Sequence, residues 1–427
     1  MRPVAGVEGQ PIEDLTAPGA LEAFGRQFEE TEARIAAFVD EPGRAERWHR
    51  EVADLAPLVP ATHPLRGVPI GVKDIFHVEG LPTRAGSRLD PEVLAGPEAS
   101  SVTRLRNAGS LLVGKTTTTE FAYFAPAATR NPHALEHTPG GSSSGSAAAV
   151  ASGQCRLALG TQTIGSIGRP ASYCGIVGYK PSYDRVPRDG VIPLAPSLDH
   201  VGLLAADLGW AQIGAETLVP DWQGLTPMDV RARLAVPSGA YLEHCDRIGR
   251  PHFESVVARL ECRGYSITFY DAFPDFEILE TRHRRLLAAE VAEVHRDWYP
   301  RFRHLYRKET AELIERGASV SEEQIAADRE ARLELRHHLD EALQREGFDL
   351  WLSPAAPGPA PRGLDSTGNP ILNLPWTQAG VPTLVIPTDV EAGLPLGAQL
   401  AGRFGGDEEL FAFATLLVED VALEIAA

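Results

Sequence analysis

The sequence predicts an α/β fold with a mostly buried sheet, because short apolar runs alternate along the chain with longer segments of helical periodicity. The runs at 68–72 and 111–113 are short and almost entirely apolar, which is typical of strands buried on both faces. No internal repeat and no evident linker interrupts the 427 residues. We therefore expect one continuous domain over residues 1–427.

Two helices are predicted before the first strand. Segment 11–39 carries apolar side chains at roughly helical spacing, namely Leu21, Phe24, Phe28 and Ile35. Segment 44–58 shows the same pattern, and a proline cluster at 57–64 ends it. A third helix is predicted over 100–107, with Ser100 as its N-terminal cap.

The second half of the chain continues the alternation. Further strands are predicted at 233–236, 265–270, 350–352 and 383–386, and a further helix at 253–262. Segment 286–343 is long, charged and helical. Its arginines and glutamates are expected to face solvent.

Composition narrows the classes of function. A formal net charge of −18 repels nucleic acid and anionic membrane surfaces, so neither is expected as a partner. No run of about eighteen apolar residues is present and residues 1–10 lack an export pattern, so no membrane association is expected. Four widely spaced cysteines without a CxxC pair favour the reducing cytoplasm. Signatures of metal binding are absent, and we expect neither a metal nor an organic cofactor.

The middle of the chain, 139–204, is rich in Gly, Ser and Thr. A flexible linker would have this composition, but apolar runs at 147–151, 157–159 and 176–177 interrupt it. Glycine and serine in such company indicate tight turns and close approach of the backbone. Chemistry is therefore sought in this region.

Lys73 closes the first apolar strand. A lysine in that position is costly if it stays charged and dry, so a depressed pKa or a tight network of partners is one interpretation. The other interpretation is that its ammonium group reaches solvent or pairs with Asp74.

Two loops rich in hydroxyl groups follow. Segment 138–147 reads Thr-Pro-Gly-Gly-Ser-Ser-Ser-Gly-Ser-Ala and leads into an alanine-rich helix, although helix capping would need only one of its serines. Segment 160–170 places Ser166 on a glycine-containing turn. There the N–H groups of Ile164, Gly165 and Ser166 could converge on an oxyanion. An ordinary Gly/Ser turn remains the alternative.

Two matches to known motifs are rejected. Residues 109–116 fit the phosphate-loop pattern GxxxxGK[ST], but 111–113 look like the strand itself. Residues 141–145 fit the nucleophile elbow GxSxG, but a proline-containing loop precedes them instead of a strand. The histidine-rich stretches near His283 and His337 lie on charged helices, so a Ser–His–Asp esterase ranks below the other interpretations.

Taken together, these segments resemble the amidase-signature family from about residue 64 to about residue 407. The resemblance rests on motifs in a fixed order: Gly-Val-Lys-Asp at 71–74, Pro-Gly-Gly-Ser-Ser-Ser-Gly-Ser-Ala at 139–147, Gly-Ser-Ile at 165–167, Cys-Gly-Ile-Val-Gly-Tyr-Lys-Pro at 174–181 and Ser-Leu-Asp at 197–199. Segments 375–382 and 394–403 also resemble the end of the family pattern.

The resemblance implies a single large α/β domain with a central twisted mixed sheet covered by helices on both faces. Within that domain we expect an N-terminal helical segment (1–60) and a catalytic core (64–205). The remainder (206–427) is expected to complete the sheet, the helical cover and part of the substrate pocket.

Carried over by position, the resemblance assigns a Ser–Ser–Lys triad. Lys73 matches the catalytic lysine, Ser142 the bridging serine that sits on a cis peptide in relatives, and Ser166 the nucleophile. The backbone of Thr163, Ile164, Gly165 and Ser166 matches the oxyanion hole. Ser143 and Asp199 are expected to support the site.

The nucleophile loop departs from the usual family pattern. Gln162, Ile164 and Gly168 stand where Asp, Gly and Arg are common, and the loop resembles malonamidase-like members. The matching arginine there holds a substrate carboxylate, so Arg169 is expected either to bind substrate or to form a structural salt bridge. Tyr123 and the stretch 373–377 are further candidates for substrate binding.

The leading hypothesis is an amidohydrolase that cleaves a small linear amide through an acyl-enzyme. Amide formation or amidotransferase-type acyl transfer in a biosynthetic pathway is the alternative, and a catalytically inactive relative is a third possibility. The resemblance further suggests a homodimer.

Overall fold

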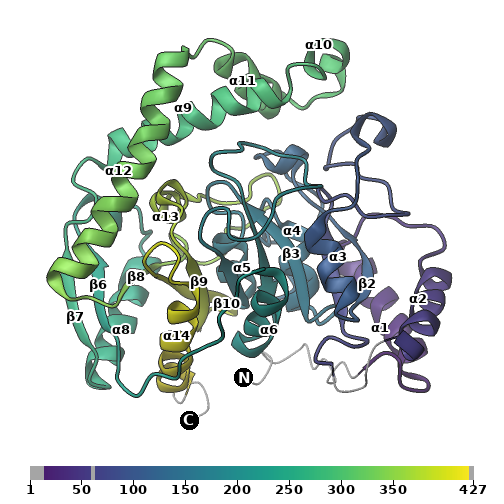
Figure 1. The fold of residues 1–427 in the computed structure, drawn as a ribbon, viewed down its shortest axis with the longest axis horizontal. Coiled ribbons are helices and arrows are strands. Elements are labelled where there is room, and N and C mark those ends of the chain that lie inside the picture. Colours follow the sequence, from purple (N-terminus) through teal and green to yellow (C-terminus); the bar gives the residue numbers. More distant parts are fainter. Residues whose placement is uncertain (1–13, 59–62, 423–427) are drawn as a thin grey trace.

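Ten strands form one mixed sheet in the computed structural model, which describes residues 14–58 and 63–422 (Figure 1). The strand order is β2-β1-β3-β5-β4-β9-β10-β8-β6-β7. Helices lie on both sides of the sheet, as predicted. The strands are β1 (Pro69–Lys73), β2 (Leu111–Thr116), β3 (Leu157–Gln162), β4 (Val177–Lys180), β5 (His200–Ala205), β6 (Arg233–Pro237), β7 (Ser266–Tyr270), β8 (Leu350–Pro354), β9 (Thr383–Glu391) and β10 (Leu394–Ala401).

The helices account for most of the remaining chain. Short 3₁₀ turns lie at Pro91–Leu94, Glu120–Ala122, Arg303–Leu305 and Ile371–Asn373. The α-helices are α1 (Ala20–Ile35), α2 (Arg44–Leu58), α3 (Ser100–Asn107), α4 (Ser144–Ala151), α5 (Gly168–Cys174), α6 (Leu208–Leu218), α7 (Ala240–Glu243), α8 (Gly249–Cys262), α9 (Phe276–Val294), α10 (Tyr299–Phe302), α11 (Lys308–Gly317), α12 (Glu322–Glu346), α13 (Leu374–Ala379) and α14 (Asp407–Ala422). No helix in the described part of the chain is long and apolar enough to cross a bilayer.

The pairing of β1 with β3 brings distant sequence segments to one edge of the sheet. The two strands are parallel, with Ile70 opposite Leu157 and Val72 opposite Leu159. Because parallel strands end at the same edge, the residues after 73 and after 162 become neighbours. β5 runs antiparallel beside β3, so the start of β5 near Asp199 reaches the same edge.

Helix α4 packs tightly behind this edge. Its small residues Ala147, Ala148 and Ala149 are fully buried. Gly145 is required by space, because a Cβ there would lie 2.2 Å from the carbonyl oxygen of Ala37 and 2.4 Å from the amide nitrogen of Thr117. The alanine-rich sequence therefore reflects close packing and not flexibility.

The N-terminal helices cover the outer part of the sheet beside β2. Phe24 and Phe28 contact Trp48 with ring centroids 5.3 and 5.1 Å apart. The predicted helix over 11–39 is confirmed as α1, though shorter, and its first positions, 11–13, lie outside the described residues. The expectation for residues 1–10, and part of the proline cluster at 57–64, also lie outside them.

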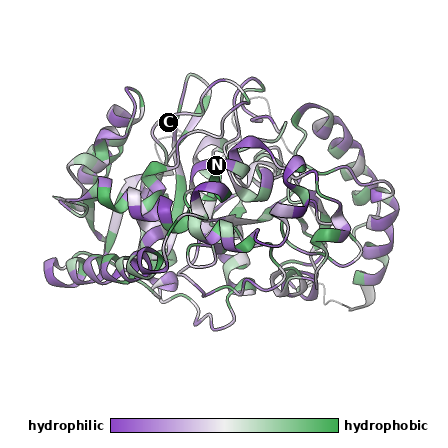
Figure 2. Cartoon of the chain, turned by 90° about the horizontal axis from the view of Figure 1, so that it is seen from above, coloured by the Kyte–Doolittle hydropathy of each residue, from purple (hydrophilic) through white to green (hydrophobic). Residues whose placement is uncertain are grey.

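Two expectations were wrong in detail. Ser100 is the first residue of α3 and not its cap, since Ala99 takes that position and the Ser100 hydroxyl donates to Asp189 at 2.6 Å. Segment 286–343 is divided among α9, α10, α11 and α12, because a turn follows α9 and Ser321 starts α12 with a capping box. Hydrophilic and hydrophobic residues alternate along the outer helices (Figure 2), and Arg332 of α12 is buried instead of solvated.

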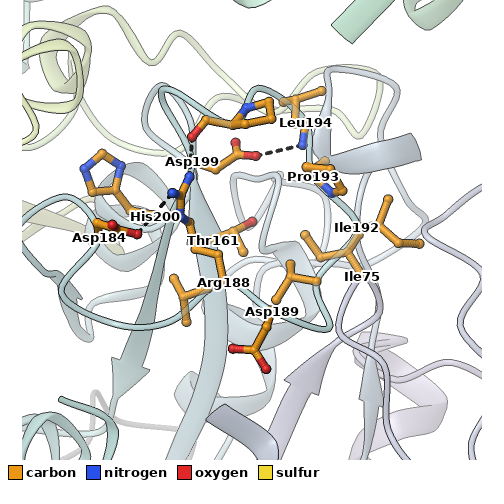
Figure 3. A pocket seen from close by; sticks show the side chains of 14 residues that line it. Ile75, Thr161, Asp184, Arg188, Asp189, Ile192, Pro193, Leu194, Asp199 and His200 are labelled. Carbon is orange, nitrogen blue, oxygen red and sulfur yellow. Dashed lines mark hydrogen bonds and ion pairs between the residues drawn. The ribbon is translucent and has the colours of Figure 1, made fainter. Parts of the chain in front are cut away.

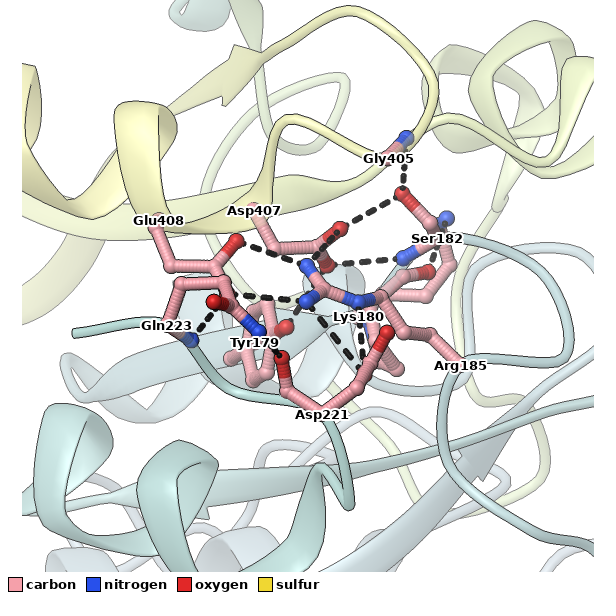
Figure 4. Close-up of polar contacts among 10 residues, drawn as sticks. Tyr179, Lys180, Ser182, Arg185, Asp221, Gln223, Gly405, Asp407 and Glu408 are labelled. Carbon is pink, nitrogen blue, oxygen red and sulfur yellow. Dashed lines mark hydrogen bonds and ion pairs between the residues drawn. The ribbon is translucent and has the colours of Figure 1, made fainter. Parts of the chain in front are cut away.

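A network of buried charges ties the C-terminal helix to β4 (Figure 4). The Asp407 carboxylate accepts hydrogen bonds from the Tyr179 hydroxyl at 2.6 Å and from the Ser182 hydroxyl at 2.6 Å. Arg185 donates to Asp407 at 3.1 Å and to Glu408 at 2.7 Å. Both carboxylates therefore meet donors, which is the condition for keeping charge inside a protein.

Candidate active site

Lys73 lies at the end of β1 with its side chain fully buried. Its Nζ is 2.8 Å from the Ser142 Oγ and 2.8 Å from the Thr161 Oγ1. Burial lowers the pKa of Lys73 well below its usual value, and the charge of Asp199 offsets only part of that effect. Among the described residues, two hydroxyl groups and no carboxylate hold this amine.

The alternative interpretation of Lys73 is wrong on both counts. Its ammonium group does not reach solvent, and Asp74 pairs instead with Lys115 at 2.8 Å. Lys115 also donates to the Thr83 hydroxyl at 3.0 Å. Residues 111–116 form strand β2, and the amine of Lys115 is bound to Asp74 and Thr83. The segment is therefore not part of a phosphate loop, as predicted.

Ser142 sits at the end of the loop before α4, after a cis peptide bond between Gly141 and Ser142. The serines around it have separate tasks. Ser144 donates to the Gly140 carbonyl oxygen at 2.8 Å, and Ser146 donates to the Leu159 carbonyl oxygen at 2.8 Å. Ser143 donates to the Thr161 carbonyl oxygen at 3.3 Å and makes no helix-capping bond. The capping interpretation therefore does not explain this loop.

Ser166 follows β3 and lines a small cavity of about 10 Å³ together with Ser142. The same cavity is lined by Tyr123, Phe124, Thr163, Ile164, Gly165 and Arg169. The residues expected as nucleophile, bridge and oxyanion loop thus meet around one space. A cavity of this size holds about one water molecule, so an acyl group can enter only if the lining side chains move.

The Ser166 loop is fixed by two side chains, Gln162 and Thr377. The Gln162 Oε1 accepts hydrogen bonds from the backbone N–H groups of residues 167 and 168, each at 2.9 Å. Its Nε2 donates to the Thr377 hydroxyl at 2.9 Å, and that hydroxyl donates to the Ile164 carbonyl oxygen at 2.6 Å. A neutral amide therefore holds this turn where the usual family pattern has a carboxylate.

Asp199 connects the loop to the neighbouring segment. Its carboxylate accepts from the Thr163 hydroxyl at 2.6 Å and from the backbone N–H groups of Leu194 and Ala195 at 2.8 and 3.0 Å. Burial raises the pKa of Asp199 to about 6. Asp199 therefore holds the loop through Thr163, and its negative charge also raises the pKa of Lys73. Its supporting role in catalysis stays a prediction.

Arg169 is 2% exposed and is held by neutral groups. It donates to the carbonyl oxygens of Gly368 and Gly141 at 3.0 and 2.5 Å and to the Thr367 hydroxyl at 3.0 Å. It forms no ion pair with any described residue, so the expected structural salt bridge is wrong. Burial lowers the pKa of Arg169 to about 10. A buried guanidinium without a counter-ion beside Ser166 is a suitable receptor for an anionic group.

Tyr123, the other single residue expected to bind substrate, is half-buried and contacts Phe124 with ring centroids 4.7 Å apart. The two aromatic rings form part of the wall of the Ser166 cavity beside Ala122. Tyr123 therefore lies near the nucleophile, and its contact with a substrate stays a prediction.

A second cavity of about 380 Å³ shares lining residues with the first, and Figure 3 shows the side chains around it. Ala122 and Leu194 line both cavities. Thr161 and Asp199, which contact Lys73 and the oxyanion loop, line the larger one. No sequence pattern indicated this cavity, because its wall comes from segments between 75 and 201 that only the fold brings together.

The histidines do not complete a Ser–His–Asp arrangement. Among the described residues, none of the side chains lining the Ser166 cavity is a histidine. His283 contacts Gln378 at 2.8 Å, and His337 pairs with Glu341 at 3.0 Å on the surface of α12. Within the described ranges, no group of His, Cys, Asp and Glu could hold a metal ion.

Three residues of this site were not predicted in their roles. Thr161 holds the amine of Lys73, while Gln162 and Thr377 hold the oxyanion loop. In the sequence, Gln162 stands out only as a departure from the usual pattern, and Thr377 only as the end of the candidate stretch 373–377. Polar residues at the end of a strand that begins as an apolar run are the signal that could have identified Thr161.

Comparisons with known proteins show which family this chain resembles. The family described as Amidase matches residues 19–411. A glutamyl-tRNA(Gln) amidotransferase subunit of Anaeromyxobacter dehalogenans (strain 2CP-C) is 32% identical over 98% of this chain and 95% of its own length. A crystal structure of an amidase superposes with a TM-score of 0.85 at 31% identity, covering 95% of this chain and 98% of that one. The corresponding amidotransferase subunit of Thermotoga maritima superposes with a TM-score of 0.76 at 25% identity, covering 92% and 89%.

Proposed function

The chain belongs to the amidase family, enzymes that act on carbon–nitrogen bonds, and we propose that it cleaves a linear amide through a covalent acyl-enzyme on Ser166. One observation carries this proposal. Lys73 is an amine without a carboxylate partner among the described residues, buried within hydrogen-bonding distance of Ser142. A neutral amine in such a place is a general base at physiological pH.

The proposed proton route runs through Ser142. Lys73 takes the proton of the Ser142 hydroxyl as Ser142 takes that of Ser166, and the Ser166 oxygen attacks the amide carbonyl carbon. Collapse of the tetrahedral intermediate breaks the carbon–nitrogen bond, and the proton returns through Ser142 to the leaving nitrogen. Water or an amine then attacks the acyl-enzyme, which gives an acid or a new amide.

The oxyanion is proposed to bind the backbone N–H groups of residues 163–166. Each such donor contributes roughly 3 kcal/mol to stabilising the transition state in comparable sites. Ile164 contributes only its backbone N–H to this site, so its side chain can differ from the glycine of the usual pattern. Support comes from the bonds of Gln162, Thr377 and Asp199 to this loop, since a donor must be held still to be effective.

The fate of the acyl group has two candidates, and the names of relatives favour transfer at least as well as hydrolysis. The Anaeromyxobacter relative and the Thermotoga structure are both amidotransferase subunits, whereas the other solved structure is described as an amidase. We therefore hold amidotransferase-type transfer beside hydrolysis. Transfer would require an amine or ammonia acceptor and, if the chain is one component of an assembly, partner chains.

Arg169 supports a finer proposal about the substrate. We propose that its guanidinium binds a carboxylate on the acyl part, as the malonamidase-like nucleophile loop suggests. The buried arginine lacks a counter-ion among the described residues and lines the Ser166 cavity. The small size of that cavity limits the acyl part to a short chain.

A labelling and product experiment tests the function. A serine-reactive fluorophosphonate should modify the parent protein but not Ser166→Ala. A panel of short amides, with and without a carboxylate one to three carbons from the carbonyl, should then be cleaved by the parent. Product analysis with and without added amine acceptors separates transfer from hydrolysis. Absence of labelling at Ser166 would refute the proposal.

Several accompanying predictions stay open. They are the independence from metals and organic cofactors, a homodimeric state, a cytoplasmic location and the partition into segments 1–60, 64–205 and 206–427. A small-molecule amide remains the proposed substrate.

A further inference from the structure

We propose that the cavity of about 380 Å³ beside the catalytic network is the subsite for the amine side of the amide, so that the preferred substrates carry a bulky apolar group on the amide nitrogen. This inference rests on the proposed function. It names the part of the substrate that the Ser166 cavity cannot hold.

The first argument is size. The Ser166 cavity has about 10 Å³ of free space, whereas its neighbour has about 380 Å³. Small-molecule sites usually measure about 300–1,000 Å³, so only the larger of these two cavities is in that range. A substrate that occupies both must be short on one side of the scissile bond and large on the other.

The second argument is the direction of proton delivery. The leaving nitrogen must approach Ser142, which returns the proton, and Ser142 is joined through Lys73 to Thr161 by two hydrogen bonds of 2.8 Å. Thr161 lines the large cavity and not the small one. Arg169 lines only the small cavity, on the acyl side. Ser142 itself lines the small cavity, so the large cavity lies at the Lys73–Thr161 end of this network, and Arg169 does not line it.

The third argument is continuity. Ala122 and Leu194 line both cavities, so the two spaces share an apolar boundary. Neither side chain carries a charge or a polar group that would disfavour an apolar substituent. The two side chains that separate the scissile bond from the larger space are therefore apolar.

One wall of the cavity fits an apolar amine, while Thr161, Asp189, Asp199 and His200 contribute polar groups elsewhere in the lining. Figure 3 shows Ile75, Ile192 and Pro193 gathered along one wall, and Val201 is a further buried apolar contact. The Arg188 guanidinium also lines the cavity, where it pairs with the exposed Asp184 at 3.1 Å and donates to the Pro196 carbonyl oxygen. Removing an apolar group from water against such a wall is favourable without any polar contact.

The subsite serves both fates of the acyl-enzyme. In hydrolysis, the carbon–nitrogen bond breaks and the free amine leaves from this cavity before water enters. In transfer, the cavity holds the amine whose nitrogen attacks the acyl carbon and loses its proton to Ser142. The same contacts recognise the amine in either direction.

Ile192 provides the test, because it is 5% exposed and lines only the large cavity. Acetamide and N-benzylacetamide share one acyl group and differ only in the amine. We expect Ile192→Trp to lower kcat/KM for N-benzylacetamide at least about tenfold and to change that for acetamide less than about twofold. The volume-conserving variant Ile192→Leu should behave like the parent with both substrates.

Binding gives a readout that does not need turnover. In a Ser166→Ala background, Ile192→Trp should raise the Kd of N-benzylacetamide at least about tenfold, as measured by calorimetry. Fluorophosphonate labelling of Ser166 in the Ile192→Trp protein shows that the nucleophile is intact. Equal losses with the two amides, or an unchanged Kd for N-benzylacetamide, would overturn the subsite. Loss of labelling in the parent would overturn the proposed function instead, and the Kd comparison would still decide the subsite.

Discussion

Lys73 and Lys115 occupy neighbouring strands and are both buried, yet they have opposite partners. Lys115 meets the Asp74 carboxylate at 2.8 Å, whereas Lys73 meets two hydroxyl groups at the same distance. Burial lowers the pKa of both, but the contact with Asp74 favours the charged form of Lys115 and offsets part of that effect. The difference teaches that the partner, and not burial alone, decides whether a buried lysine is an ion or a base.

The largest expected effect separates the two lysines by activity. Lys73→Met should lower kcat by at least about a thousandfold, because the general base is lost. Its unfolding free energy at pH 7 should equal or exceed that of the parent, since the folded state no longer has to keep an amine neutral. Chemical denaturation and steady-state kinetics measure the two quantities. A stable variant that retains activity would show that Lys73 is not the base.

The second effect concerns stability. Lys115→Met leaves the Asp74 carboxylate buried without its ion pair, and we expect a loss of about 3–5 kcal/mol in unfolding free energy. The double variant Asp74→Asn/Lys115→Met removes both charges and should recover most of that loss. If the single and the double variants are equally unstable, the pair does not behave as an ion pair.

The third effect tests the hydroxyl network at the oxyanion loop. Thr377→Val keeps the shape of the side chain but removes its bond to the Ile164 carbonyl oxygen and the acceptor for Gln162. One such bond contributes about 0.5–1.5 kcal/mol, so kcat should fall about threefold to tenfold while KM changes little. Thr377→Ser should retain most of the activity. An effect confined to KM would contradict the assigned role.

The smallest effect is a shift in pH dependence. Activity should fall as pH drops through the pKa of Lys73, because the protonated amine cannot accept a proton. Asp199 raises that pKa, so Asp199→Asn should move the acid limb of the kcat/KM profile to lower pH.

Burial also makes the stability of the protein depend on pH through Lys73. Because the pKa of Lys73 is lower in the folded protein than in the unfolded chain, the folded protein binds fewer protons at this site. The contribution of Lys73 to stability should therefore rise with pH up to its ordinary value of 10.5.

Sequence patterns predicted the parts of the molecule that depend on local order. The strands at 69–73 and 233–237 and the helices at 20–35 and 44–58 follow apolar periodicity that any chain segment carries by itself. The strand at Leu394–Ala401 is visible in the sequence only as part of a family motif, because glycine and glutamine interrupt its apolar run.

The site was predictable only where motifs marked it. Lys73, Ser142 and Ser166 stand out through their loops and the family resemblance. The role of Thr377 and the large cavity were not predicted, since both depend on contacts between distant segments. Thr377 and Ile164, for example, are 213 positions apart. The choice of Asp74 between two lysines likewise depends on the register of two strands, which no local pattern encodes.

The network of Asp407 has a consequence for synthesis. Tyr179, Ser182 and Arg185 lie shortly before Asp199 in the chain, and their shared acceptor is more than 220 residues further along. During translation these donors must wait until residues 407 and 408 have left the ribosome. A nascent chain that stops before that point is expected to have its first strands assembled while Tyr179, Ser182 and Arg185 still lack their shared acceptor. Such a chain should be cleaved by proteases more readily than the complete one.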